Sequence, residues 1–166
     1  MSKITTLAIA FSFASLQIHA QIITVQNGTS LTIQSGASFY ANGLTLTPSA
    51  DFTITNVTLT RNNTITNPSY NTSINRAYKF SATTPAFSGT VRIDYQDAEL
   101  NGLSEPPLQV NIHNGVSWAA YASATNDVTN NYVVSTAISS VALNELTLAS
   151  SLGTLPLVWL SFTAQK

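Results

Sequence analysis

Residues 44–60 read Leu-Thr-Leu-Thr-Pro-Ser-Ala-Asp-Phe-Thr-Ile-Thr-Asn-Val-Thr-Leu-Thr. Apolar side chains alternate with threonine over most of this stretch. Because successive side chains of a strand point to opposite faces of a sheet, the period of two indicates strands with one buried face and one threonine-covered face. The phase of the alternation slips between Ile54 and Val57, which predicts a bulge or a break at Asn56.

The rest of the chain has the same character. Its 166 residues include 23 Thr, 20 Ser and 15 Asn, and only 8% are charged. Threonine favours strands, whereas serine and asparagine favour turns, so this composition disfavours a helical fold. We predict an all-β chain, an antiparallel β-sandwich preceded by a short-strand N-terminal β section. Further strands are expected at 77–82, 87–96, 107–113, 116–122, 131–138 and 142–149.

The N-terminal section is assigned to residues 21–60, where a short echo repeats. The segments Leu31-Thr32-Ile33, Leu44-Thr45-Leu46 and Val57-Thr58-Leu59 begin 13 residues apart. That spacing suits either a meander of short strands or a small β-solenoid stack, and the sequence leaves both open. Residues 61–76, rich in asparagine, are interpreted as a polar connection to the β-sandwich module at 77–150.

Asn-Gly pairs predict hairpin turns. At Asn42-Gly43 a two-residue type I′ loop would place Ala41 opposite Leu44 and Phe39 opposite Leu46, which keeps apolar side chains on one face.

At Asn114-Gly115 a two-residue loop would mix the two faces. We therefore expect a three-residue loop, His113–Gly115, which places Ile112 opposite Val116 and Val110 opposite Trp118. This register turns Trp118 toward the core and Tyr121 away from it.

Both ends of the chain differ from the middle. Residues 1–20 carry Lys3, a short apolar stretch and a small residue at Ala20, the pattern of a signal peptide cleaved before Gln21. The apolar stretch is too short to cross a bilayer core of about 30 Å. Within residues 151–166, the segment Leu155–Leu160 together with Phe162 is apolar on both faces of any strand it forms, so this end is expected to be a central strand or the junction to a further module.

Charge and composition exclude several classes of function. A net charge of −1 provides no field to attract nucleic acid, and the absence of cysteine excludes disulfides and thiol chemistry. No nucleophile elbow, zinc-protease motif or phosphate-binding loop occurs. His113, the only histidine after cleavage, is expected at a turn with its ring in water. The chain is not expected to be an enzyme, and no transmembrane span is expected.

One acidic segment is the candidate binding site. Asp94, Asp97, Glu99 and Glu105 lie within twelve residues, and calcium prefers six to eight oxygen ligands. These four are the candidate calcium ligands. The alternative is a solvated loop that keeps the end of a strand soluble. A glycosidase pair among the same carboxylates is a weaker alternative. The aromatic side chains available to stack on a sugar are those of Trp118, Tyr121 and Tyr132.

Three segments together resemble exported multidomain surface proteins of Bacteroidota. Residues 88–103 read Ser-Gly-Thr-Val-Arg-Ile-Asp-Tyr-Gln-Asp-Ala-Glu-Leu-Asn-Gly-Leu and resemble a recurring β-sandwich module. Residues 144–149, Asn-Glu-Leu-Thr-Leu-Ala, are similar to its closing strand, and residues 155–164 resemble the junction to a fibronectin-like module. In that family a type IX secretion sorting domain commonly follows, and neither module follows in this sequence. The resemblance implies an extracellular setting and transfers no catalytic residue.

Together these observations predict a non-catalytic secreted or cell-surface module with a structural or adhesive role, as the N-terminal part of a larger surface protein. Its expected partners are a cell-surface polymer, a glycan or neighbouring modules. The alternative is a calcium- or carbohydrate-binding module that uses the acidic loop 94–105. No other cofactor is expected.

Overall fold

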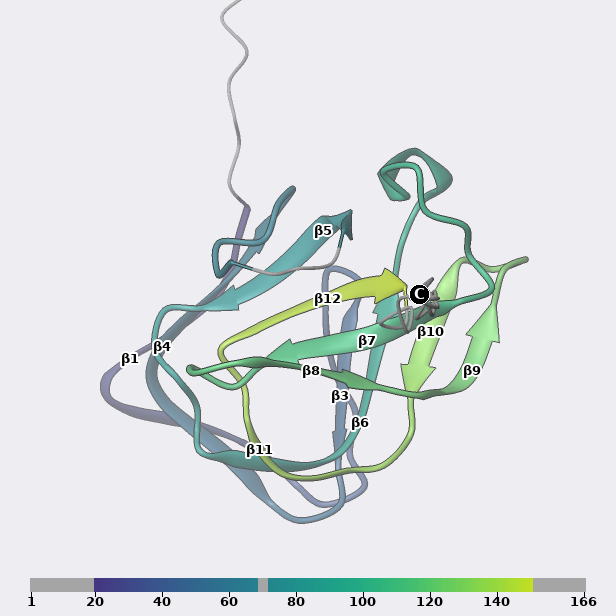
Figure 1. Cartoon of the computed structure of the whole chain (residues 1–166). Helices are drawn as coiled ribbons and strands as arrows, with labels where there is room; N and C mark the ends of the chain where they lie inside the picture. Colours follow the sequence, from purple (N-terminus) through teal and green to yellow (C-terminus); the bar gives the residue numbers. More distant parts are fainter. Residues whose placement is uncertain (1–19, 69–71, 151–166) are drawn as a thin grey trace, which may run out of the picture.

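The computed structural model describes residues 20–68 and 72–150, and its regular structure is almost entirely β-strand (Figure 1). The all-β prediction is confirmed. The strands are β1 (Ala20–Ile33), β2 (Phe39–Ala41), β3 (Leu44–Pro48), β4 (Phe52–Asn62), β5 (Ser73–Phe80), β6 (Ala86–Asp94), β7 (Leu108–His113), β8 (Trp118–Tyr121), β9 (Ser123–Asp127), β10 (Tyr132–Ser135), β11 (Ile138–Ala142) and β12 (Glu145–Ser150), with one 3-10 helix, η1 (Asp97–Glu99).

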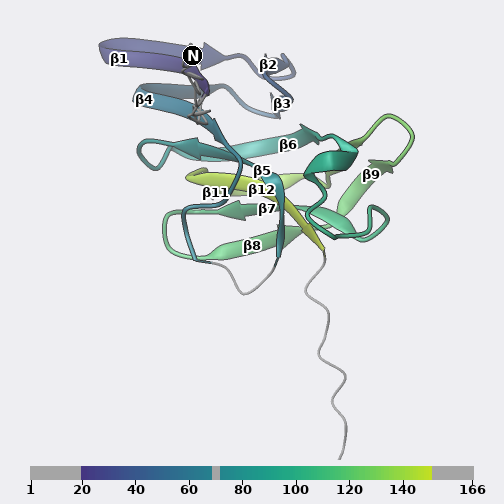
Figure 2. The ribbon, with the colours of Figure 1, turned by 90° about the horizontal axis from the view of Figure 1, so that it is seen from above.

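The strands form two antiparallel sheets. The first sheet has the order β1-β4-β5-β12-β7-β8, and Figure 2 shows β1 and β8 at its opposite edges. The second sheet has the order β2-β3-β6-β10-β9, and β11 also pairs with β6. The predicted antiparallel β-sandwich is therefore the observed architecture.

Residues 21–60 do not form a section of their own. β1 and β4 belong to the first sheet, where β4 pairs with β5. β2 and β3 belong to the second sheet, where β3 pairs with β6. These strands are thus neither a separate meander nor a solenoid stack but part of the same sandwich as residues 77–150. The connection expected at 61–76 is shorter, because β4 continues to Asn62 and β5 begins at Ser73.

The core lies between the two sheets. Leu46 and Ile93 of the second sheet and Leu59 and Leu146 of the first are at most 1% exposed. Each such side chain contributes about 1.5–3 kcal/mol by leaving water. Aromatic rings also meet in the core, with the centroids of Phe52 and Phe87 5.1 Å apart in an edge-to-face arrangement.

Two local predictions from the alternation pattern are confirmed. In the β2–β3 hairpin Ala41 pairs with Leu44, and both turn residues, Asn42 (φ 48°) and Gly43 (φ 90°), have the positive φ of a type I′ turn. In β4, Asn56 has φ 48° and the register with β1 shifts beside it. This bulge keeps the side chains before and after it on the buried face.

The predicted β7–β8 register is wrong. Val110 pairs with Tyr121 and His113 pairs with Trp118, so the loop has four residues, 114–117. The side chain of Asn114 determines this length, because its Oδ1 accepts the backbone N–H groups of Val116 and Ser117 at 2.9 Å. Tyr121 therefore packs against the core and Trp118 lies on the outer face, the reverse of the prediction.

The predictions for the chain ends concern residues beyond those described. Residues 1–19 and 151–166 lie outside the described part, so the signal peptide at 1–20 and the C-terminal segment at 151–166 stay predictions. Ala20 is described and begins β1, where it pairs with Arg61. No helix among residues 20–68 and 72–150 has the length and apolar character needed to cross a membrane.

Candidate functional site

The acidic segment at residues 94–105 begins at Asp94, the last residue of β6, and continues through η1. After β6 the chain forms η1, whose first residue follows the extended Gln96. Glu99 and Gln96 form a capping box, in which the Glu99 carboxylate accepts the Gln96 N–H at 2.9 Å. This short helix turns the Glu99 side chain inward, where the residue is only 9% exposed.

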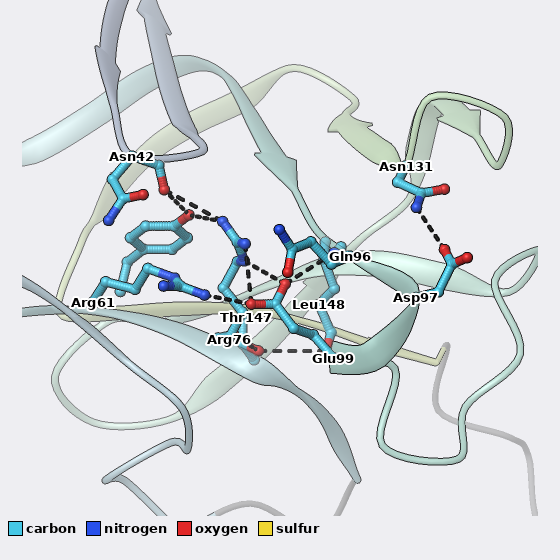
Figure 3. Close-up of polar contacts among 10 residues, drawn as sticks. Asn42, Arg61, Arg76, Gln96, Asp97, Glu99, Asn131, Thr147 and Leu148 are labelled. Carbon is cyan, nitrogen blue, oxygen red and sulfur yellow. Dashed lines mark hydrogen bonds and ion pairs between the residues drawn. The ribbon is translucent and has the colours of Figure 1, made fainter. Parts of the chain in front are cut away.

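Glu99 accepts hydrogen bonds from two arginines that enter from the first sheet (Figure 3). The Nε and Nη2 atoms of Arg76 lie 2.8 and 3.0 Å from the two carboxylate oxygens, a bidentate contact. Arg61 donates to Oε1 from the neighbouring strand. Glu99 is therefore not a solvated loop residue, because it closes an ionic cluster that joins β4, β5 and η1.

Arg76 lies on the buried face of β5 together with Ile74, Tyr78 and Phe80, because every second side chain of a strand points to the same face. The register between β5 and β12 shifts between Thr147 and Ala149, and the buried Thr147 hydroxyl donates to the Arg76 carbonyl at 2.7 Å. Figure 3 shows this contact beside the ion pair. An arginine therefore occupies a buried position whose neighbours on the same face of β5 are apolar or aromatic, beside an irregular stretch of the pairing with β12.

The β2–β3 turn covers the cluster from the second sheet. The Asn42 carbonyl accepts the Tyr78 hydroxyl at 2.7 Å and Arg76 Nη1 at 3.3 Å. Burial raises the pKa of the Tyr78 phenol, although Arg76 opposes this shift. Burial by itself would lower the pKa of Arg76, but the hydrogen bonds to Glu99 and Tyr78 raise it above the ordinary value.

The other three candidate carboxylates have other partners. Asp94 accepts Arg92 Nε at 2.6 Å, and Asp97 accepts the Asn131 side-chain amide at 2.6 Å. Glu105 accepts the Tyr95 hydroxyl at 3.1 Å.

The structure therefore disperses the four acids among four separate contacts. Within residues 20–68 and 72–150 no group of three or more His, Cys, Asp or Glu side chains is arranged to hold a metal ion. Calcium binding through Asp94, Asp97, Glu99 and Glu105 stays a prediction.

The expectation that the ring of His113 lies in water is wrong. It ends β7 at 7% exposure, and its ring meets Trp118 edge-to-face at 5.3 Å between centroids. Its Nδ1 accepts the Gly115 N–H at 3.2 Å. The four-residue loop accounts for the difference, because it pairs Trp118 directly with His113 and so covers the ring.

Glu145 is a buried carboxylate that was not among the residues expected from the sequence. It is fully buried on the outer face of β12 under the connection after β4. Its two oxygens accept the backbone N–H groups of Thr66 at 2.7 Å and Asn67 at 2.8 Å, together with both side chains. Trp118 Nε1 fastens the same connection by donating to the Pro68 carbonyl at 3.0 Å. The available signal was a lone acid directly before the alternating segment Leu146-Thr147-Leu148.

These contacts make the buried charges parts of the framework. The Glu99 cluster closes one end of the sandwich, and Glu145 holds a connection across the first sheet. Comparisons of the chain with protein-family models, curated proteins and solved structures gave no match.

Proposed function

We propose that this chain is a non-catalytic structural and adhesive module of a secreted or cell-surface protein, as the N-terminal part of a larger surface protein. Neighbouring modules of that protein and cell-surface polymers are its proposed partners. The resemblance of residues 88–103 and 144–149 to exported Bacteroidota modules and the signal-peptide pattern of residues 1–20 support the setting.

One observation carries the non-catalytic part. Each charged side chain in the described residues makes a hydrogen bond or ion pair within the protein, and the carboxylates of Glu99 and Glu145 are buried against such partners. A catalytic acid or base, by contrast, must lie within hydrogen-bond reach of a substrate proton, which these two buried carboxylates do not offer. The contacts join Asp51 to Ser35, Glu99 to Arg61 and Arg76, Lys79 to Asn144, Arg92 to Asp94, Asp97 to Asn131, Glu105 to Tyr95, Asp127 to Asn130, and Glu145 to Thr66 and Asn67.

The test is to express the full gene product with a C-terminal tag in its own host and to fractionate the cells. We expect the protein in the medium or at the outer surface, where added protease removes it from intact cells. Protein that stays inside protease-resistant cells would contradict the extracellular setting. The control is a variant lacking residues 1–20, which should remain inside.

Loss of the gene provides the second readout. A deletion strain should lose attachment to surfaces or to neighbouring cells while it keeps normal growth on its ordinary nutrients. Unchanged attachment together with a specific growth defect on one substrate would instead favour an enzyme.

A further inference from the structure

The outer face of the second sheet carries a line of side chains that crosses four strands. Tyr40 pairs with Thr45, Thr45 pairs with Arg92, and Arg92 pairs with Val134. Cross-strand partners point to the same side of a sheet, so these four side chains are neighbours on one surface. The register therefore places an aromatic ring, a hydroxyl and a guanidinium in one row.

Two further rows flank this line. On one side Ser38, Thr47 and Thr90 provide hydroxyl groups, and Ser38 and Thr47 lie 3.0 Å apart through their oxygens. On the other side Asp94 pairs with Tyr132. These side chains, except that of Tyr132, line a hollow of about 450 Å³ that is open to solvent on the sheet surface. A ligand there would lie on the face of the sheet rather than inside a closed pocket.

Arg92, one of the residues that line the hollow, is held in place by two contacts. Its guanidinium carbon lies 3.6 Å from the centroid of the Tyr132 ring, and its Nε donates to Asp94. The side chains of Arg92 and Asp94 are still 40% and 30% exposed. A fixed row of donors therefore stands beside a carboxylate acceptor, and both remain within reach of a ligand.

Tyr40 provides the apolar surface of the hollow. Its side chain is 65% exposed. Among the exposed large hydrophobic side chains of the described residues, it is the aromatic one. An exposed ring gains free energy when a ligand with a flat apolar face covers it.

We infer that this face binds a neutral saccharide. One sugar ring stacks its C–H face on Tyr40, and its hydroxyl groups exchange hydrogen bonds with Arg92, Asp94 and the threonine row. A neutral ligand is favoured over an anion because Asp94 already balances the charge of Arg92. This inference names a ligand class for the adhesive role proposed above and rests on that proposal.

The test is titration calorimetry of the wild-type protein with neutral hexasaccharides of glucose, xylose and mannose, alongside a sulfated polysaccharide and inorganic phosphate. We expect at least one neutral oligosaccharide to bind and the phosphate not to bind. Tyr40→Ala should weaken the binding about tenfold, and Asp94→Asn should also weaken it. NMR shifts on binding should centre on β2, β3 and β6.

The matched control is Val128→Ala, which also removes an exposed apolar side chain, but one outside the lining of the hollow. It should bind as the wild type does, and all three variants should melt as the wild type does. The inference is overturned if no neutral oligosaccharide binds, if the sulfated polymer alone binds, or if binding survives Tyr40→Ala. These outcomes leave the fractionation result untouched, so failure of the ligand class is distinguishable from failure of the extracellular role.

Discussion

At the scale of the residue, Glu99 is the side chain that holds together the ionic cluster of Arg61, Arg76 and η1. Glu99→Gln removes the charge that balances Arg61 and Arg76 and leaves two guanidinium groups in a half-buried space. We expect the free energy of unfolding to fall by about 2–4 kcal/mol, somewhat below the loss for a fully buried pair because Arg61 reaches solvent. Urea denaturation followed by circular dichroism measures this loss.

Asp97→Asn is the matched control, since Asp97 lies in the same helix and is exposed. Its single amide contact with Asn131 should be worth no more than about 0.5 kcal/mol. Equal stability changes in the two variants would contradict the cluster as described. If added calcium stabilised the wild type but neither variant, the predicted metal site would regain support.

A glycine in β6 has a different role. Gly89 has φ 146°, and a Cβ placed there would lie 2.2 Å from the Thr47 carbonyl oxygen and 2.7 Å from the Cα of Pro48. Gly89→Ala should therefore cost more than about 1 kcal/mol by pushing β3 away from β6. Thermal unfolding measures this cost.

Gly102→Ala is the control, because Gly102 also has a positive φ (79°) but has open space around it. The difference between the stability losses of the two variants gives the cost of the clash with β3. A smaller loss at Gly89 than at Gly102 would contradict this clash.

The candidate site could be predicted only in part at this scale. The clustering of Asp94, Asp97 and Glu99 was visible in the sequence, but the partners of Glu99 were not, because Arg61 and Arg76 come from strands that precede the segment. The sequence alone does not distinguish a solvated carboxylate in a loop from a buried carboxylate that pairs with arginines of distant strands.

At the scale of the element, the connection after β4 depends on one carboxylate. Glu145→Gln replaces an acceptor oxygen by an NH₂ group that faces N–H donors of Thr66 and Asn67. The expected loss is about 2 kcal/mol. Hydrogen exchange should show the amides of these two residues becoming faster while the β6 amides stay protected.

Asp51→Asn serves as the control, because its carboxylate also accepts one backbone N–H, from Ser35, but at an exposed site. It should leave exchange at residues 63–68 unchanged. Unaltered exchange of Thr66 and Asn67 in Glu145→Gln would show that the connection is held by other contacts.

Alternation predicted the strands well because it reports directly which face is buried. The hairpin at Asn42-Gly43 followed for the same reason, since its two-residue loop kept the apolar faces aligned. The β7–β8 loop did not follow, because a side-chain acceptor, Asn114, determined its length rather than the pattern. The strands β9 and β11 were missed as separate elements, since segments such as Ile138–Ala142 contain little alternation.

At the scale of the whole molecule, buried tyrosines should make the fold sensitive to alkali. Burial raises the pKa of Tyr78, and burial with the hydrogen bond to Glu105 raises that of Tyr95. An unfolded tyrosine ionises near pH ~10. Below that pH the stabilisation from these neutral phenols is complete, and it is lost as the pH rises toward their folded pKa values.

Urea denaturation between pH 8 and 11.5 should therefore show stability falling above pH ~10, with part of the phenolate absorbance appearing only on unfolding. In Tyr95→Phe the fall should be shallower. Ionisation of all the tyrosines near pH ~10 without loss of circular dichroism would contradict the burial of these two rings.

The order of strands in the first sheet has a consequence for biosynthesis. β12 is the last described strand along the chain, yet it lies between β5 and β7 at the centre of its sheet. A nascent chain lacks this strand until residue 150 has left the ribosome, so β5 and β7 have no partner between them. Chains shorter than this lack the strand between β5 and β7, so we expect the first sheet to be completed only after β12 has emerged.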